Sequence, residues 1–256
     1  MPDSVRVIEN EAFAECSLLT SVTIPPSVTS IGDRAFSECS SLERIEIPES
    51  VEYIGGFSFN ECSMLKEVEI PSSVKVIQNS IFYRCWSLES VVIPPSVTLI
   101  CPGAFNNCTS LKTINIPSSV TEIGYCVFNR CSSLVSLEIP SSVKSIGSAA
   151  FNECSSLMNV EIPSSLKEIS DSCFSECKSL ESVEIPPSVI SIGSFAFAGC
   201  SSLTSIEIPS SVKAIGDDAF SRCSALTSVI IPSSVFSPRL GIGKNVEIDK
   251  YFDLDI

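Results

Sequence analysis

The sequence predicts a repeat solenoid, in which short coils of chain stack on one another and align their strands in a parallel sheet. The first observation is a strict 23-residue period, which runs from Val5 to Val235 without an insertion or deletion. The second is a column of cysteines on this period, each preceded by phenylalanine three positions earlier. A constant period is expected because each coil must place its apolar side chains on those of the coil before it. The column consists of Cys16, Cys39, Cys62, Cys85, Cys108, Cys131, Cys154, Cys177, Cys200 and Cys223.

Each unit begins with a short strand, as in LTSVTIP from Leu19 to Pro25. Val22 and Ile24 alternate with polar residues, which predicts a strand with one buried face. Pro25 has no amide hydrogen and cannot extend a ladder of hydrogen bonds, so the strand is expected to end at Ile24. Ten such strands at a spacing of about 4.8 Å would make a sheet roughly 45 Å long.

The return path of each coil is predicted to pack behind the strand through a second apolar group. Gly32 is expected to permit a tight bend, whereas Gln78, Cys101 and Ser170 at the same position of other units indicate that a positive φ is not required there. The stretch from Gly32 to Cys39 is too short for more than a helical turn or an irregular arc. One coil cannot bury enough apolar surface to offset the entropy of ordering its chain, so its neighbours must complete the core. The second group consists of Val28, Ile31, Ala35, Phe36 and Cys39.

The pattern from Leu180 to Ser202, L-x-x-V-x-I-P-x-S-V-x-x-I-G-x-x-A-F-x-x-C-S-S, resembles the 23-residue leucine-rich repeat of the BspA-like family. The resemblance implies a leucine-rich repeat superhelix with a parallel β-sheet on its concave face and short turns or arcs on its convex side. It further implies a surface antigen or secreted module that serves cell adhesion and protein binding.

The period divides the chain into two parts. Residues 1–235 are predicted to form an array of about ten units, and residues 236–256 a C-terminal cap or a linker to a following domain. Within the second part, NVEI from Asn245 to Ile248 echoes the strand core out of register. This segment is predicted to form a last strand that covers the open end of the sheet.

Composition limits the classes of partner. The formal net charge is −14, with 30 acidic and 16 basic residues, which argues against nucleic acid and anionic membrane and favours a protein partner with a basic surface. No apolar run reaches the roughly 18 residues of a membrane span, and the first residues lack the profile of a signal peptide. The sequence indicates no cofactor and does not fix the oligomeric state.

The 13 cysteines raise the question of disulfides or metal. Because the column lies among apolar residues of the return path, it is predicted to form a buried ladder of free thiols. Cys101, Cys126 and Cys173 fall off the period, and the absence of histidine and of a C-x-x-C pair argues against zinc. Many free thiols favour a reducing compartment, whereas the resemblance favours the cell surface, so the compartment stays open.

Four successive units carry glutamate at the exposed middle position of the predicted strand. These carboxylates, Glu138, Glu161, Glu184 and Glu207, are expected to form a row of like charges. Three interpretations stay open: a solvated face copied by duplication, a docking surface for a basic partner, or a metal site. Calcium is the weakest of these because it needs six to eight oxygens around one point, whereas a ladder offers them in a line.

The unit from Ile77 to Ser96 is the least regular of the array. It contains Tyr83, Arg84 and the single tryptophan, Trp86, and it places Val92 where glutamate is usual. Since Trp, Tyr and Arg often dominate binding energy, these four residues are a candidate anchor site in an apolar gap of the acidic face. The alternative is sequence drift within a redundant array.

The sequence favours a non-enzymatic protein–protein interaction module that uses its sheet face. Catalysis requires unlike groups that converge on one reacting atom, and equal coils without inserted loops offer no such pocket. The alternative function is a structural spacer or scaffold arm of a larger protein, which would be cytosolic and fused to a signalling domain such as a kinase. No catalytic or metal-ligating residues are predicted.

Overall fold

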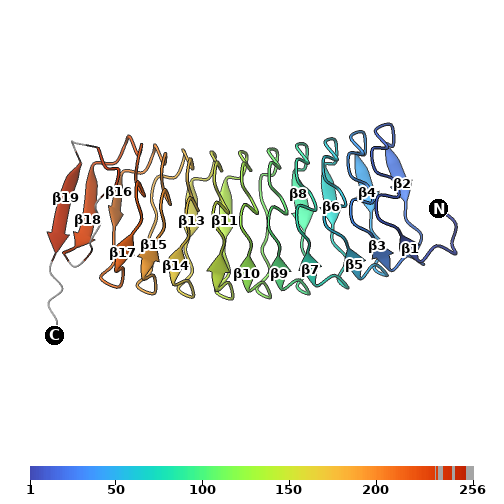
Figure 1. Ribbon diagram of the computed structural model, residues 1–256, viewed down its shortest axis with the longest axis horizontal. Helices are drawn as coiled ribbons and strands as arrows, with labels where there is room; N and C mark the ends of the chain where they lie inside the picture. Colours follow the sequence, from blue (N-terminus) through green and yellow to red (C-terminus); the bar gives the residue numbers. More distant parts are fainter. Residues whose placement is uncertain (234, 236–238, 244–245, 252–256) are drawn as a thin grey trace.

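The computed structural model describes residues 1–233, 235, 239–243 and 246–251 and shows a parallel-strand solenoid of about ten turns. The coils stack along the long axis, with the N-terminus at one end and the final strands at the other (Figure 1). Among the described residues there is no helix, and so none that is long and apolar enough to cross a membrane. The predicted repeat solenoid is confirmed.

Strands of three residues, and two final strands of five residues, run along one side of the solenoid, which we call the sheet face. They pair in parallel with a shift of one repeat period, for example Ser136 with Asn159. The sheet is interrupted where residues 113–115 and 182–184 form no strand. Its strands are β2 (Ser21–Thr23), β4 (Arg44–Glu46), β6 (Glu67–Glu69), β8 (Ser90–Val92), β11 (Ser136–Glu138), β13 (Asn159–Glu161), β16 (Ser205–Glu207), β18 (Ser228–Pro232) and β19 (Glu247–Tyr251).

A second ladder of two-residue strands, absent from the sequence prediction, runs along the return path. In each, the first residue is wholly or partly exposed and the second is a buried isoleucine, as in Ser30 and Ile31. Two residues are too few to produce a recognisable alternation in the sequence. The strands are β1 (Val7–Ile8), β3 (Ser30–Ile31), β5 (Tyr53–Ile54), β7 (Val76–Ile77), β9 (Leu99–Ile100), β10 (Glu122–Ile123), β12 (Ser145–Ile146), β14 (Glu168–Ile169), β15 (Ser191–Ile192) and β17 (Ala214–Ile215).

The rest of the return path, such as Asp33–Cys39, forms a run of turns that we call the arc. Alternate amides donate to the next coil: Arg34 N to Gly56 O at 3.0 Å, and Phe36 N to Ser58 O at 2.8 Å. Arg34 has a left-handed φ of 55°, whereas Gly32 does not have a positive φ, which agrees with the presence of Gln78, Cys101 and Ser170 at the same position of other coils. A Cβ at Gly32 would lie 2.5 Å from the backbone nitrogen of Asn10, and glycine is needed there for close approach of the preceding coil.

The core consists of apolar columns that run through all the coils. The phenylalanine rings stack with centroids 5.1 to 5.7 Å apart, from Phe13–Phe36 to Phe197–Phe220. Next to them, each buried thiol of the cysteine column donates to a phenylalanine carbonyl one coil earlier, as Cys154 Sγ does to Phe128 O at 3.1 Å. All 13 cysteines are free, which agrees with the predicted thiol ladder, although Cys16 is exposed.

The last coil differs from the others in two respects. Strand β18 includes Pro232, against the expectation that proline ends each strand, because β19 pairs alongside it as far as Tyr251. Ile248 pairs with Val229, so the shift between β18 and β19 is shorter than the repeat period. Strand β19 overlaps the edge strand predicted from NVEI at Glu247 and Ile248, whereas Asn245 lies outside the described residues. Leu240 O accepts from Phe220 N at 3.0 Å and so continues the arc. The division into an array and a cap or linker stays a prediction, since residues 236–238, 244–245 and 252–256 lie outside the described residues.

Candidate functional site

The predicted row of four glutamates lies on the sheet face, and we call it the acidic row. Glu138 of β11 pairs with Glu161 of β13, and Glu161 forms a bridge with Glu184 of the next coil. Glu207 occupies the same position in β16. Each residue is exposed, but it follows the buried middle residue of its strand rather than being that middle residue, because the strands end one residue earlier than expected.

Two adjoining grooves run along the acidic row. The larger, of about 760 Å³, is lined by the carboxylates of Glu138, Glu161 and Glu184 and by Ile and Pro residues that follow them. The smaller, of about 400 Å³, shares Glu184 and adds Glu207. No lysine or arginine lines either groove among the described residues. The carboxylates therefore face solvent in a hollow without a cation to balance them.

The N-terminal half of the sheet face is different because some of its carboxylates have cationic partners, although Glu67 and Glu69 of β6 form no ion pair among the described residues. Arg44 Nη2 lies 2.8 Å from Glu46 Oε1, and Lys112 Nζ lies 2.7 Å from Glu89 Oε2. The hydrogen bond from Lys112 and its charge lower the pKa of the Glu89 carboxyl. The pair Lys112–Glu89 joins residues one period apart, so opposite charges at this spacing become neighbours on adjacent coils.

The four carboxylates of the acidic row have no such partner. In the part of the chain that the structure describes, no lysine or arginine nitrogen lies within 4.0 Å of any of them. The column that holds Lys66 and Lys112 in earlier coils continues here with Val135 and Met158, which are 45% and 43% exposed. An exposed apolar pair thus lies at one end of an uncompensated acidic row.

The arrangement does not resemble a metal centre. Among the described residues, no three acidic or cysteine side chains come close enough together to hold an ion. Burial raises the pKa of the column thiols, to about 12 for Cys177, so they are protonated at neutral pH and are poor metal ligands.

The second predicted cluster is only partly assembled. Tyr83 and Arg84 lie together in one arc, with the guanidinium carbon 5.0 Å from the ring centroid, and Arg84 also pairs with Glu61 at 3.1 Å. Trp86 follows the arc and is 45% exposed. Val92 lies on a different part of the coil, in β8, where it is exposed in a groove with the Arg44–Glu46 pair.

The ion pairs between coils and the Val135–Met158 pair were not predicted from the sequence. Their signals were present as residues one period apart: opposite charges at Glu89 and Lys112, and two apolar residues at Val135 and Met158 in a column that is otherwise polar. Reading every column of the repeat, rather than the glutamate column alone, would have found them.

Comparison with known sequences places the chain in a family. The family described as BspA type leucine rich repeat region matches residues 1–112, 75–185 and 126–239. The chain belongs to this family. Its 23-residue coil, stacked phenylalanines and parallel sheet are therefore the properties of a BspA-type leucine-rich repeat array.

Several solved structures are similar to this chain. A leucine-rich repeat protein from Bacteroides ovatus is 26% identical with a TM-score of 0.76, over 98% of this chain and 76% of that one. A leucine-rich cell surface protein from Faecalibacterium prausnitzii is 29% identical with a TM-score of 0.59, over 96% and 83% of the two chains. A third, from Eubacterium ventriosum, is 28% identical with a TM-score of 0.66, over 96% and 70%. No curated protein matches the chain.

Proposed function

We propose that this BspA-type array is a non-enzymatic protein-binding module whose C-terminal sheet face captures a basic segment of a partner. The observation that carries the proposal is the groove in which Glu138, Glu161 and Glu184 lie in adjacent coils with no cation in its lining. An enzyme would need unlike groups directed at one atom, whereas this face repeats one group.

The electrostatics of the acidic row favour a cationic partner. Adjacent coils are about 4.8 Å apart, and two carboxylates at that distance repel each other by about 1 kcal/mol in water and by more in a hollow. Arginine or lysine side chains placed between them would replace this repulsion with attraction and would also speed association. A partner segment in extended conformation along the solenoid axis would meet the four carboxylates in turn.

The apolar pair gives the same surface a second kind of contact. Val135 and Met158 lie in the strand-forming segments that lead to Glu138 and Glu161, and both are exposed. The preferred partner segment would therefore combine basic residues with an apolar one, since a desolvated apolar anchor contributes more affinity than exposed ion pairs. The F. prausnitzii relative is described as a cell surface protein, which supports adhesion as the biological setting.

The test is the affinity of a fluorescent peptide that alternates arginine and serine over seven residues. Glu161→Lys combined with Glu184→Lys should weaken binding roughly tenfold or more, because close charge pairs contribute on the order of 1.5 kcal/mol each. Glu122→Lys combined with Glu168→Lys is the matched control, since both residues are exposed in the second ladder and the net charge changes equally. Equal weakening by the two double variants would show that only net charge matters and would refute the proposed site.

The spacer function makes a different prediction. A spacer needs no binding surface, so the peptide should not bind above background and the sheet-face variants should behave as the unchanged protein does. Saturable binding that is lost in the sheet-face variant alone rules out a passive spacer.

A further inference from the structure

We propose that the arc side of the array carries a second site, which binds a linear neutral glycan. The site is a groove of about 650 Å³ that crosses the arcs of several coils and that we call the polar groove. Its lining contains amides, hydroxyls and ion-paired side chains, among them Asn107, Thr109 and Asn152, and no aliphatic or aromatic residue. This site goes beyond the proposed function because it lies on another side of the coil and uses different chemistry.

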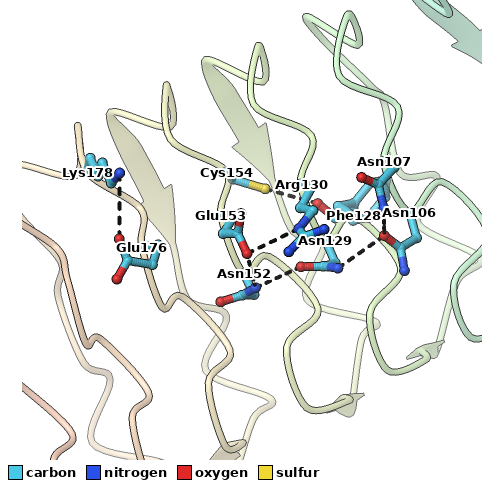
Figure 2. Close-up of polar contacts among 10 residues, drawn as sticks. All are labelled: Asn106, Asn107, Phe128, Asn129, Arg130, Asn152, Glu153, Cys154, Glu176 and Lys178. Carbon is cyan, nitrogen blue, oxygen red and sulfur yellow. Dashed lines mark hydrogen bonds and ion pairs between the residues drawn. The ribbon is translucent and has the colours of Figure 1, made fainter. Parts of the chain in front are cut away.

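A ladder of amides runs beside the polar groove, and two of its members, Asn107 and Asn152, line the groove (Figure 2). Asn129 Nδ2 donates to Asn106 Oδ1 at 3.0 Å, and Asn152 Nδ2 donates to Asn129 Oδ1 at 2.8 Å. Asn107 Nδ2 also donates to Asn106 Oδ1, at 2.8 Å. Since each amide fixes the orientation of the next, the oxygen at the end of the ladder, Asn152 Oδ1, is held in one direction without a ligand.

That last oxygen and a neighbouring hydroxyl are left open. Within the described part of the chain, neither Asn152 Oδ1 nor Ser175 Oγ has a hydrogen-bond partner, although both residues line the polar groove and Ser175 is only 7% exposed. Although most of the Ser175 residue is buried, its hydroxyl oxygen and Asn152 Oδ1 both reach the solvent of the groove, so a ligand can contact them. An acceptor beside a group that can donate and accept is complementary to a sugar hydroxyl, which also does both.

The charged side chains of the groove are paired with one another, which is compatible with a neutral ligand. Arg130 pairs with Glu153 at 3.1 Å, and Glu176 pairs with Arg222 at 2.8 Å and with Lys178 at 3.7 Å. Arg222 and Lys178 therefore share one carboxylate, and the groove lining has three cations and two carboxylates. Paired guanidinium and carboxylate groups keep free hydrogen-bonding positions that hydroxyl groups of a ligand can use.

Trp86 occupies the same position of the repeat as Thr109, which lines the groove, and its ring offers a flat apolar surface. Thr109, which lines the groove, donates from Oγ1 to Trp86 O at 3.3 Å, so the two occupy equal positions of adjacent coils. Trp86 is 45% exposed and has room to stack against the C–H face of a pyranose ring. Trp86 itself is not part of the groove lining, and we place it one coil beyond the groove as the stacking surface at its end.

The spacing of the coils matches the length of the ligand unit. On the arc side the rings of Phe105, Phe128 and Phe151 follow one another at 5.5 Å. This rise is comparable with the length of one unit in an extended β-1,4-linked chain of pyranoses. A linear glycan along the solenoid axis would present one sugar to each coil, with its first ring on Trp86.

Isothermal titration calorimetry of the whole chain with cellohexaose, chitohexaose and xylohexaose tests the site, and the fluorescence of the single tryptophan provides a second readout. At least one of the three should bind and shift the Trp86 emission. Trp86→Ala and Ser175→Ala should each weaken binding roughly tenfold, as expected for loss of a stacked ring or a buried hydrogen bond. Trp86→Phe should retain most of the affinity because it keeps the flat ring.

The controls separate this site from the sheet face and from general charge effects. Ser221 occupies the position of Ser175 two coils later and lies outside the groove lining, so Ser221→Ala should leave binding unchanged. The combined Glu161→Lys and Glu184→Lys variant should also bind normally. The proposal is overturned if none of the three oligosaccharides binds, if binding persists unchanged in both Trp86→Ala and Ser175→Ala, or if only the polyanion heparin binds.

Discussion

Two residues in each arc adopt the left-handed backbone conformation, and most of them are not glycine. They recur four residues apart, as Arg34 and Glu38 do with φ of 55° and 61°. This conformation costs roughly 1–2 kcal/mol for a residue with a Cβ. The hydrogen bonds from these amides to the next coil, such as Glu38 N to Asn60 O at 2.7 Å, hold the backbone in place. The arc therefore stores strain that the stacking of coils offsets.

Ala149 provides a test of this strain. Its φ is 56° and its amide donates to Asp171 O at 2.9 Å. Ala149→Gly should raise the free energy of unfolding by about 0.5–1 kcal/mol, because glycine adopts this conformation without the steric cost. Chemical denaturation measures the change.

The neighbouring Ala150→Gly is the control. Ala150 is buried and has no positive φ, so glycine there should lower the free energy of unfolding by about 1 kcal/mol. Destabilisation of the same size at both positions would contradict the argument.

The thiols differ in their reactivity because they differ in burial. Cys16 is exposed, whereas Cys131 is fully buried, its pKa is raised by burial, and its Sγ donates to Phe105 O at 3.3 Å. Under native conditions at pH 8, a maleimide reagent should label Cys16 first and leave Cys131 unmodified until the chain unfolds. Mass spectrometry of the labelled peptides identifies each site, and rapid native labelling of Cys131 would disprove the buried column.

At the scale of the element, the stacked phenylalanines hold consecutive arcs together. Phe128 is fully buried and lies 5.5 Å from both neighbouring rings. Phe128→Ala should lower the free energy of unfolding by about 3–5 kcal/mol, since it leaves a cavity between two rings. Phe195→Ala, at a ring that is 44% exposed, should change it by no more than about 0.5 kcal/mol. Similar losses of stability in the two variants would contradict the claim that the stacked rings hold consecutive arcs together.

The sequence predicted the elements in which the same residue types recur in every unit. The strand near Val22, the buried Phe36 and the free Cys39 all follow from the 23-residue period. The second ladder was not predictable because each of its strands has two residues. The left-handed residues were not predictable either, because arginine, glutamate, alanine and phenylalanine occupy these positions and none of them signals a positive φ.

The sequence likewise predicted only part of the candidate site. Exposure of Glu161 follows from alternation within the strand, but the lack of a cation near it depends on which residues the adjacent coils bring alongside. Likewise, Val92 and Trp86 are close in sequence but lie on different parts of the coil, so a shared role of the two in one anchor stays a prediction. Residues one period apart, rather than residues adjacent in the chain, are therefore the neighbours on this surface.

At the scale of the whole molecule, the buried thiols make the free energy of unfolding fall as the pH becomes alkaline. The ordinary thiol pKa is 9.0, and burial raises the pKa of Cys177 to about 12. Between these values the unfolded chain releases a proton that the folded chain retains, so stability is complete below pH 9 and falls as the pH rises. A fully buried thiol such as Cys177 lowers the free energy of unfolding by about 1.4 kcal/mol for each pH unit in this range.

Because the column contains many such thiols, the urea concentration at the midpoint of unfolding should be much lower at pH 10 than at pH 8. Urea denaturation in the presence of a reducing agent at pH 7, 8, 9 and 10 measures this dependence. Equal midpoints at pH 8 and pH 10 would show that the thiols are not desolvated in the folded chain.

The most direct test of the central claim, that the uncompensated acidic row selects a basic partner, is a reciprocal exchange of charge. The combined Glu161→Lys and Glu184→Lys protein is titrated with the arginine–serine peptide and with the same peptide in which glutamate replaces arginine. The account predicts that the unchanged protein binds only the arginine peptide and that the variant prefers the glutamate peptide. If the variant still binds the arginine peptide with the original affinity, the acidic row is not the binding site.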